Sequence, residues 1–159
     1  MRRLIPKSPR SLFVPALALL AIAGCSKAKD LSVDQAWVRL PAVPGQPAAA
    51  YFTLHGGPAD ATLIDVSTDV AIRSEMHETM RGMGGGAAGM TRMTPVPSVS
   101  VPARSTGRFA PGGRHVMFFG LDPSVKRGGA MTLTFTFGNG ERIRQSAPVL
   151  GAGDPPPGE

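Results

Sequence analysis

Residues 131–149 read MTLTFTFGNGERIRQSAPV, and this segment carries the clearest secondary-structure signal in the chain. Apolar residues alternate with threonine from Met131 to Phe137, which is the two-residue period of a strand with one buried face. Gly138-Asn139-Gly140 can supply the positive φ angles of a tight hairpin turn. The chain is therefore expected to return as a partner strand over Arg142–Val149.

The rest of the chain shows the same kind of pattern. Gly and Pro interrupt it at short, roughly regular intervals, and no segment sustains the 3.6-residue apolar period of a helix. We expect seven further strands at Ala36–Leu40, Ala48–His55, Thr62–Ser67, Ile72–Glu78, Met90–Thr94, Val99–Val101 and Arg114–Leu121. Many short strands without a helix predict an all-β domain, a β-sandwich or Greek-key barrel.

The N-terminal residues are organised as a bacterial secretory leader. An apolar run, Leu12–Ala23, follows a basic segment containing Arg2, Arg3, Lys7 and Arg10. Ala23-Gly24-Cys25 resembles a lipobox, in which Cys25 is acylated and the bond before it is cut. Ser26 after the cysteine favours the outer membrane. The alternative is an ordinary signal peptide with a chance cysteine. We expect a leader at 1–24, a tether at 25–30, a β domain at 31–150 and a disordered tail at 151–159.

Removing this leader changes the charge of the protein. The whole chain has 17 Lys and Arg, 11 Asp and Glu and a formal net charge of +6, but four of the cations lie in the leader. The mature chain is left with a net charge of +2 and no basic patch, which argues against nucleic-acid binding. Cys25 is the one cysteine in the sequence, so its lipidation would leave no thiol for a disulfide, a zinc–thiolate site or a nucleophile.

Methionine and histidine gather in two segments. Residues 75–93 read EMHETMRGMGGGAAGMTRM, and residues 114–117 read RHVM. In a strand, His115 and Met117 point to the same face. That pair alone is explained well by a core methionine beside a surface histidine. With His77 and Met93 nearby, however, two imidazoles and thioethers could converge, and thioether sulfur selects Cu(I).

These segments resemble the periplasmic copper chaperones of the PCu(A)C family. The family motif is His, ten residues, Met, twenty-one residues and H-x-M, and twenty-one residues separate Met93 from His115 here. Val101-Pro-Ala103 and Pro111-Gly-Gly113 also match. The resemblance implies a cupredoxin-like fold, Cu(I) ligation by His77, Met93, His115 and Met117, and copper delivery to the dinuclear centre of cytochrome c oxidase. Fifteen residues, not ten, follow His77, and the extra five fit a glycine-rich loop over 82–89.

Other methionines are candidate auxiliary ligands, namely Met76, Met80, Met83 and Met90. A loop carrying them could offer transient thioethers for capturing or handing over copper. The alternative is that Met80 and Met90 pack on the end of the barrel and Met83 is incidental. The tail has neither Met nor His, so we expect one copper site per molecule. His55 and the carboxylates, including Glu75, are expected to be solvated surface groups.

The sequence thus predicts a monomeric envelope copper chaperone and not an enzyme, because four protein ligands leave no open coordination position. Its partner would be a copper acceptor such as cytochrome c oxidase subunit II or its assembly factors. The alternatives are a copper-buffering or resistance protein and a structural envelope lipoprotein. A blue-copper electron carrier would need a Cys ligand.

Overall fold

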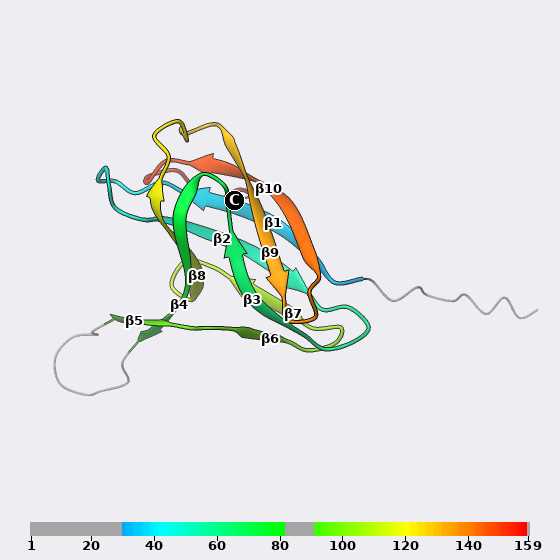
Figure 1. Ribbon diagram of the computed structural model, residues 1–159. Helices are drawn as coiled ribbons and strands as arrows, with labels where there is room; N and C mark the ends of the chain where they lie inside the picture. Colours follow the sequence, from blue (N-terminus) through cyan, green and yellow to red (C-terminus); the bar gives the residue numbers. More distant parts are fainter. Residues whose placement is uncertain (1–29, 82–90, 159) are drawn as a thin grey trace, which may run out of the picture.

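The computed structural model describes residues 30–81 and 91–158, which form ten β-strands and contain no α-helix (Figure 1). No helix in these ranges is long and apolar enough to cross a membrane. The prediction of an all-β domain is confirmed. The strands are β1 Ser32–Arg39, β2 Ala48–His55, β3 Ala61–Ser67, β4 Ala71–Arg81, β5 Thr91–Pro95, β6 Val99–Val101, β7 Thr106–Phe109, β8 Arg114–Leu121, β9 Ala130–Phe137 and β10 Arg142–Leu150.

The strands form one hydrogen-bonded path in the order β5-β4-β8-β2-β1-β10-β9-β3-β6, with β7 beside β2. The β1–β10 pair is parallel, and the other pairs are antiparallel. The path curls so that its two halves enclose a single core (Figure 1). One half therefore carries β4, β5 and β8 together, with an inner face on the core and an outer face away from it.

Aromatic and leucine side chains from both halves fill the core. Phe52 of β2 stacks on Phe109 of β7 with ring centroids 4.2 Å apart. It meets Phe135 of β9 edge-on at 4.7 Å. Along β9, Leu133, Phe135 and Phe137 are all fully buried, while the threonines between them face outward. The alternation read from the sequence therefore sets which face of β9 packs inward.

The β9–β10 hairpin forms as predicted, with a different turn. Of residues 138–140, Gly140 alone has a positive φ, of 87°. Its N–H donates to the Phe137 carbonyl at 2.9 Å, and the Phe137 N–H donates to the Glu141 carbonyl at 2.9 Å. A three-residue loop made of a type I turn and one left-handed residue has this pattern. A single glycine is enough to close it.

Three features differ from the sequence-based expectations. β7 was not predicted, because it is only four residues long and contains Gly107, and it forms by pairing with Phe52–His55 of β2. β1 starts earlier than expected and contains a bulge between Asp34 and Trp37. β4 continues to Arg81 through its pairing with β5. Each depends on pairing with another strand, which the local sequence pattern does not show.

The C-terminal tail, expected to be disordered, makes defined contacts at Gly151 and Asp154. The Asp154 carboxylate accepts a hydrogen bond from the Gly151 N–H at 2.7 Å and pairs with Arg127 at 2.6 Å. Arg39 Nη2 donates to the Asp154 backbone carbonyl at 3.0 Å. The sequence shows no apolar anchor here because the anchor is a single aspartate that contacts distant arginines.

Truncating Phe135 to alanine tests the position of the core. Loss of this ring, which is 0% exposed, should lower the free energy of unfolding by about 3–5 kcal/mol. Thr132→Ala on the exposed face of the same strand should change it by less than about 0.5 kcal/mol. Urea denaturation of both variants measures the difference, and equal stabilities would contradict the assigned faces of β9.

Candidate metal centre

Two predicted ligands form a directly opposed pair on the outer face of β4 and β8. His77 is the Cα partner of His115, and their rings stack with centroids 5.9 Å apart and an interplanar angle of 29°. Their chain neighbours Met76 and Val116 are 6% and 0% exposed in the core. Because side chains alternate along a strand, burial of these neighbours turns both imidazoles outward.

The two predicted sulfur ligands flank this pair on the same face. Met93 of β5 lies opposite Thr79, two residues beyond His77 along β4. Met117 lies two residues beyond His115 along β8, opposite Glu75. The register thus places the imidazoles in the middle, one thioether on each side. Met93 is 55% exposed, and its unbranched thioether side chain has several rotatable bonds.

The hydrogen bond of His115 identifies its tautomer. Its Nδ1 lies 3.0 Å from the Gly113 carbonyl, and a carbonyl oxygen only accepts hydrogen bonds. Nδ1 therefore carries the proton, and the lone pair of neutral His115 resides on Nε2. A backbone carbonyl that fixes the ring in this way is the usual companion of a metal-binding imidazole.

His77 is fixed by a carboxylate. Its Nε2 lies 3.0 Å from Glu75 Oε2. The hydrogen bond with His77 lowers the pKa of Glu75; desolvation opposes the shift, and Arg73 adds to it. An ionised carboxylate can only accept, so His77 Nε2 donates. The other ring nitrogen, Nδ1, is buried and has no hydrogen-bond partner.

The pair is therefore suited to share an ion. A metal–imidazole nitrogen bond is about 2 Å long, so two rings bound to one ion have centres no more than about 6 Å apart. The observed 5.9 Å satisfies this limit. No group of three or more His, Cys, Asp or Glu side chains in the described ranges could hold a metal ion. The predicted set of four donors adds the thioethers of Met93 and Met117 to the two imidazoles.

Aromatic side chains cover one side of the histidine pair. The Tyr51 ring centroid lies 6.5 Å from that of His115 and 4.4 Å from that of Trp37. Burial raises the pKa of the Tyr51 phenol, and Arg39 partly opposes this effect, so the hydroxyl stays neutral at physiological pH. His115 itself is only 6% exposed, and this burial limits the access of water to its ring.

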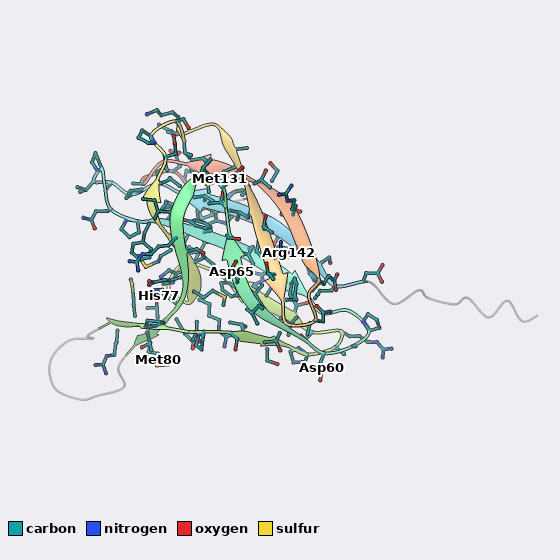
Figure 2. The ribbon with its side chains drawn as sticks, viewed as in Figure 1. Asp60, Asp65, His77, Met80, Met131 and Arg142 are labelled. Atoms are coloured by element: carbon teal, nitrogen blue, oxygen red, sulfur yellow. The ribbon has the colours of Figure 1, made fainter. Side chains whose placement is uncertain are left out.

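The remaining candidates are distributed differently. Met76 is 6% exposed within the core and faces away from the histidine pair, so its assignment as an auxiliary ligand is not supported. Met80 is 53% exposed on β4, further along the strand from His77 (Figure 2). His55 pairs with Asp34 at 3.0 Å, at the opposite end of β2 from the strand that carries Met117. Cys25, Met83 and Met90 lie outside the described residues.

Two neighbours of the site were missed from the sequence. Glu75 was expected to be a solvated carboxylate, although the E-x-H spacing on a strand places it on the face of His77. Tyr51 has no local signal, because its approach to His115 depends on the placement of β2 beside β8.

Solved structures place this fold among PCuAC domains. The copper-bound PCuAC domain from PmoF2 is 20% identical, with a TM-score of 0.61 over 78% of this chain and 95% of that domain. The solution structure of CuI-DR1885 from Deinococcus radiodurans is 28% identical, with a TM-score of 0.57 over 80% of this chain and 83% of that protein. The prediction of a cupredoxin-like β fold is confirmed.

Sequence comparison gives the family. The family described as "Putative lipoprotein LpqE-like" matches residues 31–149, and the chain belongs to it. A relative from Leifsonia xyli subsp. xyli (strain CTCB07), "Putative lipoprotein Lxx21020", is 27% identical over 146 residues, which span 84% of this chain and 85% of the relative. The resemblance to PCu(A)C proteins inferred from the motif is borne out.

The tautomer of His115 can be tested in the metal-free protein. Free imidazole favours a proton on Nε2, whereas the Gly113 carbonyl should hold it on Nδ1. Long-range ¹H–¹⁵N correlation spectra should show His115 with a protonated Nδ1 and an unprotonated Nε2. The reverse pattern would contradict the proposed donor atom.

Proposed function

We propose that this protein is an envelope copper chaperone that binds one Cu(I) through His77, His115, Met93 and Met117. The observation that carries the proposal is the opposed histidine pair, in which His77 Nδ1 has no partner, flanked by two thioethers. Soft thioether sulfur together with imidazole selects Cu(I) over harder cations.

The donor set also suits the release of its cargo. Two neutral imidazoles and two neutral thioethers hold a monovalent cation with less electrostatic attraction than thiolates would. The nearby charge of Glu75 is paired with Arg73 at 2.7 Å and adds little net field at the ion. Met93, half exposed at the edge of the sheet, is the donor that an acceptor could displace first.

Solved neighbours support copper as the cargo. One is a copper-bound PCuAC domain and another is CuI-DR1885, and the second is 28% identical to this chain. The Cu(I) state of the copper in CuI-DR1885 matches the preference of thioether donors for Cu(I). In this proposal the ion is a cargo held in a binding site, and the protein is not an enzyme.

The leader and the family support a place in the cell envelope for this protein. Cys25 would carry the lipid, and residues 25–30 would tether the domain. The favoured anchor is the outer membrane, with the domain in the periplasm. The family description as a lipoprotein supports an anchor. A monomeric domain would deliver copper to an acceptor such as cytochrome c oxidase subunit II or its assembly factors, as the PCu(A)C resemblance suggests.

The second candidate function is copper buffering or resistance by the same site. The partial exposure of Met93 favours transfer, because a storage site gains from full enclosure of its ion. Mixing the Cu(I)-loaded domain with a soluble oxidase subunit II domain separates the two functions. A chaperone transfers copper faster than the free-ion dissociation rate, whereas a buffer transfers it at that rate.

A competition titration against a Cu(I) chelator tests the site. Wild-type protein should bind one equivalent. His77→Ala or His115→Ala should weaken binding by more than about 100-fold, since even the outer partners of a metal ligand commonly contribute 10–100-fold. His55→Ala, at a histidine that bonds to Asp34, is the matched control and should leave the affinity unchanged. Unchanged affinity in both ligand variants would remove this site.

A further inference from the structure

We propose that Glu75 is a positioning residue that holds His77 with its Nδ1 directed to copper. This inference rests on the proposed function and concerns a carboxylate for which no role was expected. Glu75 lies on the same face as His77, two residues earlier on β4, and Oε2 accepts a hydrogen bond from Nε2 at 3.0 Å. The carboxylate therefore holds the proton on the nitrogen that does not bind the ion.

The ring of His77 has little freedom to choose another partner. Its side chain is only 12% exposed, and its Nδ1 is sealed from water without a hydrogen bond. If the ring turned over by 180°, Cε1 would face Glu75 and Cδ2 would take the place of Nδ1, so the hydrogen bond and the candidate donor atom would both be lost. The carboxylate selects between these two orientations, because it can bond only to a protonated nitrogen.

Glu75 is itself held from the other side. Its second oxygen, Oε1, accepts from Arg73 Nη1 at 2.7 Å. The Arg73 guanidinium lies over the Phe119 ring, 4.1 Å from the centroid. Phe119 is the cross-strand partner of Arg73, as Met117 is of Glu75 and His115 of His77. The three rungs make one chain of contacts, from Phe119 through Arg73 and Glu75 to His77.

The contacts of Glu75 fit a positioning role better than they fit a simple surface ion pair with Arg73. Arg73 alone would satisfy Glu75, and an exposed pair of this kind is worth little. The second oxygen is instead aimed at the imidazole of a proposed ligand. A carboxylate that accepts from the outer nitrogen of a metal-binding histidine fixes its orientation and raises its basicity. Loss of such a partner typically costs 10–100-fold in metal affinity.

The chain offers a matched control three residues further along the same strand. Glu78 also forms one ion pair, with Arg114 at 3.2 Å, and its side chain is 31% exposed against 35% for Glu75. Strand alternation puts Glu78 on the other face of β4 from His77. Glu78→Ala therefore removes the same formal charge from the same strand without removing a hydrogen-bond partner of the imidazole.

Cu(I) competition titrations of Glu75→Ala, Glu75→Gln and Glu78→Ala test the proposal. Glu75→Ala should weaken Cu(I) binding 10–100-fold. Glu75→Gln should retain more affinity than Glu75→Ala, because its amide oxygen still accepts from Nε2. Glu78→Ala should match the wild type. Equal affinities for Glu75→Ala and wild type would overturn the proposal. Equal losses in Glu75→Ala and Glu78→Ala would also overturn it, because net charge alone would then explain the effect.

A copper-free measurement separates this proposal from the proposed function. In metal-free wild type and in Glu78→Ala, ¹H–¹⁵N spectra should show a His77 Nε2–H protected from exchange with water. In Glu75→Ala that signal should be lost, while the thermal unfolding transition is retained. A persistent signal in Glu75→Ala would overturn the positioning role. Failure of wild-type protein to bind Cu(I) would contradict the copper function. The His77 Nε2–H signal in metal-free protein would still test whether Glu75 positions the ring.

Discussion

The register between β4 and β8 places His77 opposite His115 and Glu75 opposite Met117, and the candidate site is built around these two rungs. It is held by burial of the alternate residues, Met76 on one strand and Val116 and Phe118 on the other. A one-residue slip of either strand would turn that strand's apolar side chains to water and its imidazole into the core. The hydrophobic core therefore orients the candidate metal site, although none of its side chains would touch the ion.

Around the histidine pair, each hydrogen bond leaves one nitrogen free. The Gly113 carbonyl occupies Nδ1 of His115, and Glu75 occupies Nε2 of His77. The Tyr51 ring, which packs against Trp37, lies beside His115 on one side of this pair. In the proposed site, the sulfur donors are the flexible side chains of Met93 and Met117. A rigid pair of imidazoles with movable thioethers combines preorganised binding with a route for release.

Much of this domain could be predicted from local patterns. The β9–β10 hairpin follows from strict alternation and a glycine turn, and the outward direction of His115 and Met117 follows from their spacing. The spacing between Met93 and His115 matched the PCu(A)C motif, which singled out four side chains on one face. What local patterns miss is non-local pairing: β7 forms only against β2, the tail is held through Asp154, and Tyr51 reaches His115 from another strand. Glu75 was assigned to the solvated surface from the sequence, because its proposed positioning role depends on His77 being a ligand.

X-ray absorption spectroscopy of the Cu(I)-loaded domain examines the ion's surroundings themselves. The structure leads us to expect an edge characteristic of Cu(I), nitrogen scattering from two imidazoles at about 2.0 Å and sulfur scattering near about 2.3 Å. Replacing both Met93 and Met117 by leucine should abolish the sulfur contribution and leave the imidazole contribution in place. A first shell of nitrogen and oxygen without sulfur, or one with a single imidazole, would contradict the shared Met/His site.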